Sequence, residues 1–548
     1  MGRRLAYATL AVILALVSVH GLRTTASPAY ADNLTNSRDN LRTGWDPAEP
    51  ALAPSSVTST TFGQLFATKV QGQVYAQPLI IGDMLVVATE DNYVYGLDAA
   101  SGAIRWQRSV GTPWPASAIG CADLTPNLGN TSTGVYDPGT GSVYFTTKVN
   151  DGPDLLHPNW YMHAVDARTG AERTDWPVKI VGTPANDPAH PFTPYDVNQR
   201  PGLLLLDGVV YLAFGAQCDH GHYVGWVAGV NTGTRAISMW SDEVGATSSE
   251  AGIWQGGGGL VSDGPGRIFL STGNGITPPD GPGSNPPQQL SESVVRLGVA
   301  ADGTIAAKDF FSPANAALLD RNDQDLGSGA PVALPAPYFG TGAIPQLMVQ
   351  IGKDGRLFLL NRDRLGGKNQ KAGGGDDVVQ TLGPYKGVWG KPAAYGGEGG
   401  YVYVVQNSDS MLAFKYGTDG TGRPALSLAG NTSEHFGYTS SSPIVTSDAT
   451  SPGSAVVWAN NVDGPSGANG RLCAYNAVPA NSHLNLLRCF PIGTATKFST
   501  PASSNGRVYT GTRDGVVYGF GQPTTAALQT TQTGFGDVMV SQTSTATV

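Results

Sequence analysis

The chain has 548 residues, a formal net charge of −9 and only 14% charged residues, beside 73 glycines and 38 prolines. This composition, with 40% hydrophobic residues, indicates many short strands joined by turns and excludes a helical or disordered chain. No run of lysine and arginine is present, which excludes nucleic acid as a partner because neutralising phosphates requires clustered cations.

Residues 1–31 have the pattern of a secretory signal peptide. Arg3 and Arg4 precede an apolar run from Leu5 to Val19, and Ala29-Tyr30-Ala31 provides small residues for cleavage before Asp32. The alternative is a membrane anchor, but the run is short for a stable span. No later apolar segment is long enough to cross a bilayer. We therefore expect a secreted, extracellular protein with no membrane span after removal of the signal.

The first strand unit follows at Val86 to Gln107, VVATEDNYVYGLDAASGAIRWQ. Apolar residues alternate through VYGL, as in a half-buried strand. Asp98 opens a turn, Gly102 closes it, and Trp106 follows four residues later.

The same unit recurs along the chain at intervals of roughly 45 to 70 residues. Further copies begin at Tyr161, Gly225, Ser293, Gly355, Ser410, Gly470 and Gly515. Most are preceded by another strand pair, such as GDMLVVAT or DGVVYLAF, so each repeat holds about four strands, as one propeller blade does. The alternative of two stacked sandwiches does not explain this period. We predict an all-β fold, an eight-bladed β-propeller of four-stranded antiparallel blades, over residues 32–523.

The last copy stops at Phe520, so its outer strand is predicted to come from the N-terminal side, near Phe62–Val70. Closing the ring in this way removes exposed blade edges. Residues 524–548 are rich in Thr, Ser and Gln, and are interpreted as a tail or as the start of an immunoglobulin-like domain.

Four cysteines in an exported chain predict two disulfides. Cys473 and Cys489 flank one predicted hairpin and are expected to pair with each other. Cys121 is then left with Cys218.

The segments D-A-A-S-G-A-I-R-W and D-A-R-T-G resemble the tryptophan-docking repeat of quinoprotein alcohol dehydrogenases. The resemblance covers most of the chain after residue 31. It implies an exported eight-bladed propeller that holds pyrroloquinoline quinone (PQQ) and calcium near the channel axis. The repeat is specific for the fold but not for activity, because non-catalytic propellers share it.

Three stretches resemble the site of that family. FLSTGNG places a calcium ligand on Asn274, NDQDLGSGAP places the catalytic base on Asp325, and IGKDGRLFLLNR places the quinone-contacting cation on Lys353. The set is chemically coherent. A hard cation takes oxygen ligands and polarises a carbonyl, a carboxylate accepts the alcohol proton, and a cation stabilises the reduced quinone. The resemblance therefore implies Asp325 both as base and as a metal ligand.

The sequence also departs from the family pattern. The calcium-binding glutamate of the family is replaced by Gln217 in AFGAQCD, and a neutral amide is a poorer calcium ligand than a carboxylate. Glycines Gly256–Gly259 occupy the place of the floor tryptophan, with Trp254 a few residues upstream, and adjacent paired cysteines are absent. Trp254 and Trp389 are candidates for contact with the cofactor or with a sugar, and buried tryptophan docking between blades is the alternative interpretation.

Other motifs are weaker. His220 and His222 could hold a metal, but two solvated histidines in a loop are commoner. The segment that begins at Asp320 does not have the residue spacing of an EF-hand calcium loop. The four glycines Gly256–Gly259 are not followed by the residues of a phosphate-binding loop, so we expect that they allow a close approach of the backbone.

Three functions remain open from the sequence. The least supported is hydrolysis or lysis of a polysaccharide by carboxylates in the channel, because no carboxylate pair has a spacing that fits it. The other two are as follows. The first is a quinoprotein-type oxidoreductase that acts on a small alcohol or sugar with PQQ and calcium. The second is a non-catalytic extracellular propeller that binds a glycan or a protein at the channel mouth.

Overall fold

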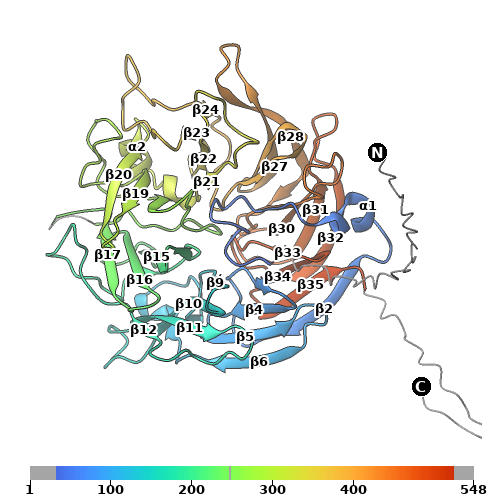
Figure 1. Ribbon diagram of the computed structural model, residues 1–548, viewed down its shortest axis with the longest axis horizontal. Coiled ribbons are helices and arrows are strands. Elements are labelled where there is room, and N and C mark those ends of the chain that lie inside the picture. The colour runs from blue at the N-terminus through green and yellow to red at the C-terminus, as the bar shows by residue number, and fades with distance from the viewer. Residues whose placement is uncertain (1–31, 246–248, 524–548) are drawn as a thin grey trace, which may run out of the picture.

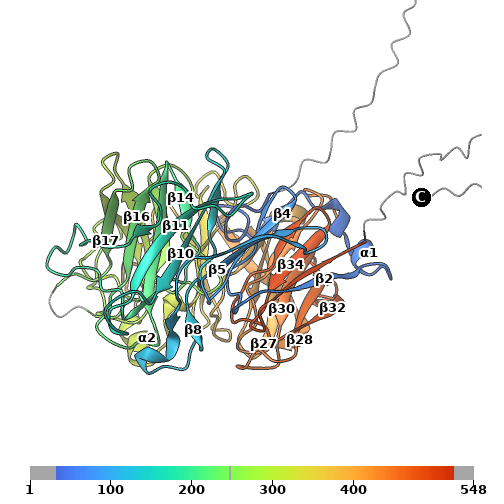
Figure 2. The same cartoon turned by 90° about the horizontal axis from the view of Figure 1, so that it is seen from below.

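The computed structural model describes residues 32–245 and 249–523, so the predicted signal peptide and the predicted tail lie outside the described residues. Eight antiparallel sheets are arranged in a ring, which confirms the predicted eight-bladed propeller (Figure 1). Seen from the side, the strands of each sheet run through the thickness of the ring (Figure 2). None of the helices within the described residues is both long and apolar enough to cross a bilayer.

Each blade follows the previous one along the chain, and we number the blades in that order. The strands of blades 1 to 4 are β3 (Leu79–Ile81), β4 (Met84–Ala88), β5 (Tyr93–Asp98) and β6 (Ile104–Ser109); β9 (Val135–Asp137), β10 (Ser142–Val149), β11 (Asn159–Asp166) and β12 (Val178–Lys179); β13 (Val197–Asn198), β14 (Leu204–Leu206), β15 (Val209–Ala216), β16 (Trp226–Asn231) and β17 (Ile237–Ser241); and β18 (Arg267–Ser271), β19 (Val294–Val299) and β20 (Ile305–Phe311).

The strands of blades 5 to 8 are β21 (Val332–Ala333), β22 (Leu347–Ile351), β23 (Leu357–Asn361) and β24 (Gln380–Leu382); β25 (Ala393–Tyr395), β26 (Tyr401–Val405), β27 (Asp409–Thr418) and β28 (Pro424–Phe436); β29 (Ile444–Thr446), β30 (Val456–Asn461), β31 (Gly470–Asn476) and β32 (Leu486–Gly493); and β33 (Ala502–Ser504), β34 (Arg507–Gly511), β35 (Val516–Gly521) and β2 (Gly63–Lys69). The remaining elements are β1 (Trp45–Asp46), η1 (Pro50–Leu52), α1 (Pro54–Val57), β7 (Trp114–Pro115), η2 (Ala116–Ile119), β8 (Asn127–Leu128), α2 (Ala316–Arg321), η3 (Leu326–Ser328) and η4 (Gly397–Gly399).

The ring is closed by the N-terminal strand, as predicted. β2 pairs antiparallel with β35, with Gly63 opposite Gly521 and Lys69 opposite Val516, and so supplies the outer strand of blade 8. The strand count deviates in three blades. Blade 3 has a split inner strand, blade 7 gains β1 as a parallel neighbour of β29, and the inner strand of blade 4 is reduced to a bridge between Val261 and Phe269.

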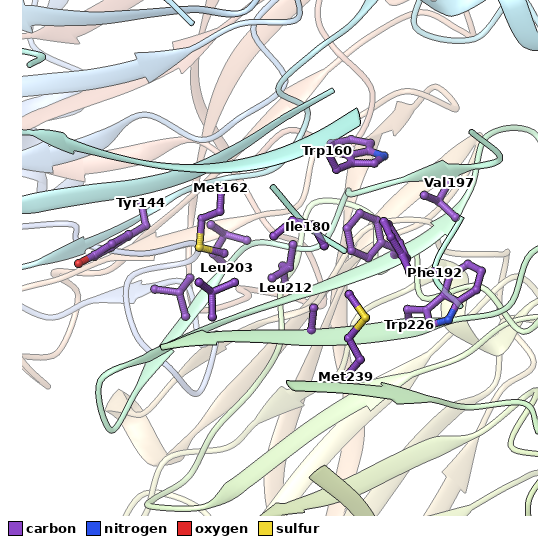
Figure 3. Packing of buried hydrophobic residues seen from close by; sticks show 14 of the residues in the cluster. Tyr144, Trp160, Met162, Ile180, Phe192, Val197, Leu203, Leu212, Trp226 and Met239 are labelled. Carbon is purple, nitrogen blue, oxygen red and sulfur yellow. The ribbon is translucent and has the colours of Figure 1, made fainter. Parts of the chain in front are cut away.

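The cores lie between adjacent blades, because each sheet buries its faces against its neighbours. Between blades 2 and 3, Trp160 and Met162 of β11 pack with Leu212 of β15 (Figure 3). Phe214 of β15 belongs to the same core, and none of these four side chains is exposed. Alternate residues of each strand are buried in interfaces of this kind, which is why apolar residues alternate with other residues along the repeats.

Two disulfides are present, Cys473–Cys489 and Cys121–Cys218, as predicted. Cys473 and Cys489 lie opposite each other on β31 and β32 of blade 7. The second bond joins the segment between β7 and β8 to the segment that follows β15, 97 residues later.

Residues 33–46, here called the axial segment, cross the middle of the ring (Figure 1). The segment is bonded to the inner parts of seven blades, through backbone hydrogen bonds or through its Arg42 side chain. Its partners in these blades are Ile80, Tyr136, Leu203, Leu260, Ala333, Ala394 and Val445. The sequence offered no strand or repeat signal for this segment, because its order comes from contacts with distant parts of the chain.

Candidate active site

A cavity of about 180 Å³ lies between the inner segments of the blades, on the axis of the ring. Its walls come from the connections that follow or precede inner strands, which is where a propeller brings distant loops together. The lining residues that could contact a ligand are Asp123, Asn198, Arg200, Gln217, Asp219, Trp254, Asp325, Lys353, Trp389, Tyr438, Lys497 and Phe498. Five of the six residues singled out from the sequence are therefore together: Gln217, Trp254, Asp325, Lys353 and Trp389.

Asp325 and Lys353 form a buried ion pair. Asp325 precedes the short helix η3 and Lys353 follows β22, and their Oδ2 and Nζ atoms are 2.5 Å apart. Burial raises the pKa of Asp325, and the ammonium group of Lys353 offsets part of that shift. For Lys353 burial opposes the charge, but the carboxylates of Asp325 and Asp323 outweigh burial and raise its pKa. The pair holds a basic carboxylate at the wall of the cavity.

Asn274 lies against this pair, although it is not part of the cavity wall. Its backbone N–H donates to Oδ1 of Asp325 at 2.8 Å, and its side-chain amide donates to Oδ1 of Asp323 at 3.0 Å. Its side-chain carbonyl oxygen is buried and has no hydrogen-bond partner among the described residues. A buried oxygen without a donor is an unsatisfied acceptor, which a cation beside Asp325 would satisfy.

Gln217 is buried directly after β15. Its side-chain N–H donates to the backbone carbonyl of Asp123 at 3.1 Å, so the segment between β7 and β8 orients its amide. Asp219, two residues later, accepts a hydrogen bond from the hydroxyl of Tyr223 at 2.7 Å. His220 and His222 are exposed, and no group of three His, Cys, Asp or Glu side chains within the described residues is placed to hold a metal.

Trp254 rests on glycines. A Cβ atom at Gly215 would lie 3.0 Å from its indole ring, and one at Gly252 would lie 2.6 Å from it, so any larger residue would displace the ring. Its Nε1 donates to the carbonyl of Ala216 at 3.2 Å, which fixes the ring at the cavity wall. Trp389, Tyr438 and Phe498 continue the aromatic wall through edge-to-face contacts.

The glycines Gly256 to Gly259 mark close backbone approach, as predicted. A Cβ atom at Gly256 would lie 2.2 Å from the carbonyl of Trp389, and one at Gly257 would lie 2.0 Å from the carbonyl of Phe498. The run therefore lets Trp389 and Phe498 of other blades come to the axis.

Two cations at the cavity were not identified from the sequence. Lys497 pairs with Asp123 at 2.5 Å, whereas Arg200 has no carboxylate within 4 Å among the described residues. The Arg200 guanidinium instead stacks over Phe498 and Tyr75, at 5.3 and 6.0 Å from the ring centroids. With Lys353, three cations line the cavity. A single basic residue in an irregular segment gives no indication in the sequence that its side chain lies at the cavity.

A disulfide also lies at the cavity, although adjacent cysteines are absent. Cys218 lines the wall and is bonded to Cys121. The family pattern has adjacent cysteines, whereas the two bonded cysteines here are 97 residues apart in the chain.

Glu90 provides a test of the electrostatics near the site. It is fully buried after β4, accepts the N–H of Gly129 at 2.8 Å, and leaves its second oxygen without a partner among the described residues. Burial raises its pKa from 4.5 to about 8, against the smaller opposing effect of the Gly129 hydrogen bond.

Between pH 4.5 and about 8, Glu90 loses its proton in the unfolded chain but keeps it in the folded chain, so the free energy of unfolding falls as pH rises through this range. We expect Glu90→Gln to remove about 2 kcal/mol of the stability loss between pH 5.5 and 7.5. Urea unfolding of both proteins across this range measures the difference. Parallel pH profiles of the two proteins would contradict the assignment.

Comparisons with known proteins agree with the fold. A family model described as outer membrane protein assembly factor BamB matches residues 57–179. Among curated protein sequences, none matches this chain. The chain is an eight-bladed propeller whose fold is similar to that of quinoprotein alcohol dehydrogenases at low sequence identity.

Three solved structures share the fold. Quinohemoprotein alcohol dehydrogenase from Comamonas testosteroni has a TM-score of 0.60 at 15% identity, over 90% of this chain and 81% of that one. The corresponding enzyme ADHIIG from Pseudomonas putida HK5 has a TM-score of 0.60 at 14% identity, over 91% and 81%. A europium-containing methanol dehydrogenase has a TM-score of 0.59 at 13% identity, over 89% and 98%.

Proposed function

We propose that this chain is a quinoprotein-type oxidoreductase that oxidises an alcohol or a sugar in the axial cavity, with PQQ and calcium. The observation that carries the proposal is the buried Asp325–Lys353 pair beside the unsatisfied side-chain oxygen of Asn274. A carboxylate with a raised pKa is the group that proton abstraction from a hydroxyl requires.

The residues around the cavity fit such a cofactor in kind. PQQ, when bound, supplies an electron sink that accepts hydride. It is a flat, polyanionic molecule, and the cavity offers aromatic rings together with three cations, of which Arg200 has no carboxylate partner among the described residues. Asn274 and Gln217 would provide neutral oxygen ligands and Asp325 a charged one, so we expect weak calcium binding.

The roles of the chain's own residues follow from their contacts. Asp325 would accept the proton of the substrate hydroxyl, while the N–H of Asn274 holds Oδ1 in place. Lys353 would keep Asp325 ionised between turnovers through its 2.5 Å contact. Trp254 and Trp389 would exclude water from the reacting atoms.

A titration of the purified chain with PQQ, with and without calcium, tests the proposal by calorimetry and visible absorbance. We expect saturable, calcium-dependent binding of one cofactor, followed by turnover of an alcohol or sugar with an artificial electron acceptor. Gln217→Glu adds a carboxylate ligand and is expected to tighten calcium binding about tenfold, whereas Asn274→Ala is expected to weaken it. Absence of binding at high micromolar cofactor would overturn the proposal.

A second candidate is favoured by the size of the cavity. Its volume of about 180 Å³ is below the 300 to 1,000 Å³ of ordinary ligand pockets, so the tricyclic quinone would require side chains to move. In this alternative the chain is a non-catalytic extracellular propeller that binds a glycan or a protein at the channel mouth. Failure of the cofactor titration together with binding of a polymer would select it.

Under either function we infer that the protein works outside the cytoplasm. Its two disulfides are typical of an oxidising compartment, in agreement with the signal-peptide pattern of residues 1–31.

A further inference from the structure

At the junctions that follow blades 1 and 8, an aromatic ring rests on two glycines. In blade 1, Trp106 of β6 lies opposite Gly96, and a Cβ atom at Gly96 would come within 2.2 Å of its ring. The same ring covers Gly170, in a turn of blade 2, where a Cβ atom would lie 2.4 Å from it. One glycine of the ring's own blade and one of the next blade therefore form a socket for the ring.

Blade 8 repeats this arrangement with a different residue. Phe66 of β2 lies opposite Gly519, and a Cβ atom at Gly519 would come within 2.4 Å of its ring. Phe66 also covers Gly102 in the next blade, where a Cβ atom would again lie 2.4 Å from its ring. The socket is thus present at two junctions and accepts phenylalanine as well as tryptophan.

Between blades 3 and 4 both glycines are present, but no ring bridges them. The ring of Tyr211, from blade 3 itself, lies over Gly229, 2.8 Å from a Cβ atom placed there, and leaves Gly303 uncovered. Ser238 of β17 stands opposite Gly229, in the position that Trp106 has opposite Gly96. A Cβ atom at Gly303, in the turn of blade 4, would have no heavy atom of the described residues within 4 Å. A serine side chain is too short to bridge the two glycines.

An open groove of about 570 Å³ occupies this junction, where β17 lies beside β20 (Figure 1). Gly229, Ser238 and Gly303 themselves line it, together with the half-buried apolar side chains Leu206, Val209, Ile237 and Val299. The groove between blades 8 and 1 has a similar volume of about 640 Å³, but neither Phe66 nor Gly102 lines it. Of these two grooves, only the one between blades 3 and 4 is lined by the glycines that correspond to those of the socket.

The charge of the groove is one-sided. Asp207 and Asp302 stand exposed on its rim, and no lysine or arginine of the described residues lines it. Backbone and side-chain donors of Thr304 lower the pKa of Asp302, so it is ionised at neutral pH. If a ligand placed an aromatic ring in the groove, lysine or arginine residues next to that ring would therefore be attracted to the rim.

We propose that this groove binds a polypeptide segment of a partner protein that presents one aromatic side chain beside lysine or arginine. The ring would lie over Gly303 and beside Ser238 and Tyr211, at the side of the junction where Trp106 and Phe66 reach the next blade at their own junctions. Buried aromatic anchors of this kind dominate the energetics of protein interfaces. The inference does not depend on the cavity at the axis, which is lined by other residues.

The test uses the purified full chain and the peptide acetyl-Lys-Gly-Trp-Gly-Lys-amide, followed by saturation-transfer NMR of the indole protons. We expect saturable binding that is lost when alanine replaces tryptophan in the peptide. Ser238→Trp fills the socket from within and is expected to weaken binding at least tenfold, while raising the melting temperature. Ser427→Trp adds a ring at an exposed serine of β28 in blade 6 and should leave binding unchanged.

The charge of the rim is tested separately. Asp207→Asn combined with Asp302→Asn is expected to weaken the lysine-flanked peptide several-fold and to remove the salt dependence of binding. No binding at millimolar peptide, equal binding of the alanine peptide, or an unchanged affinity in a folded Ser238→Trp protein would overturn the proposal. Self-association of the chain that Ser238→Trp abolishes would replace the partner by a second copy and also overturn it.

Discussion

Replacing Arg42 with alanine is expected to lower the free energy of unfolding by about 3–5 kcal/mol. Arg42 lies in the axial segment and has no exposed surface. Its guanidinium donates to the carbonyls of Leu203 and Leu260 at 2.8 Å each, and to the hydroxyl of Thr35 at 2.6 Å. The alanine variant leaves these acceptors buried without donors and opens a cavity, and both effects destabilise the folded chain.

Urea unfolding measures the effect, with the midpoint compared at constant slope. Arg364→Ala is the matched control, because Arg364 pairs with Asp377 at the surface with 69% of its side chain exposed. That variant should lose less than about 1 kcal/mol. Arg42→Lys keeps the charge but loses the planar fork, so an intermediate loss is expected. A free energy of unfolding of Arg42→Ala within about 1 kcal/mol of the parent value would show that the axial segment does not hold the ring together.

Asp325→Asn is expected to lower turnover by about a thousandfold, if the proposed oxidoreductase function is correct. The amide oxygen of asparagine can still accept the N–H of Asn274, and Lys353 retains its contact with Asp323 at 2.5 Å. The fold should therefore persist while the group that accepts the substrate proton is lost. Cofactor binding by calorimetry should change much less than turnover.

Asp323→Asn supplies the control for this prediction. Asp323 contacts the same lysine at the same distance, but its side chain is 70% exposed and it does not line the cavity. Turnover in this variant should stay within a few-fold of the parent. Full activity of Asp325→Asn, or equal losses in both variants, would remove Asp325 from the role of base.

The candidate site was predictable only where it resembled a known pattern. Asn274, Asp325 and Lys353 stood in recognisable motifs, and the structure brings all three into contact. Arg200 and Lys497 carried no such motif, since one basic residue in an irregular segment gives no sign of where its side chain lies. The role of these residues as calcium or quinone ligands stays a prediction that the titration tests.

The architecture was predictable from the amino-acid sequence, because each blade of a propeller repeats the same local pattern of strands and turns. Alternating apolar residues and turn glycines recur at a near-constant interval, and the short last repeat indicated that β2 would close the ring. Only the tertiary structure decided what occupies the axis and the junctions. The path of residues 33–46 through the ring, the cystine at the cavity and the uncovered Gly303 beside Ser238 depend on contacts between segments far apart in the chain. Such contacts impose no period on the sequence.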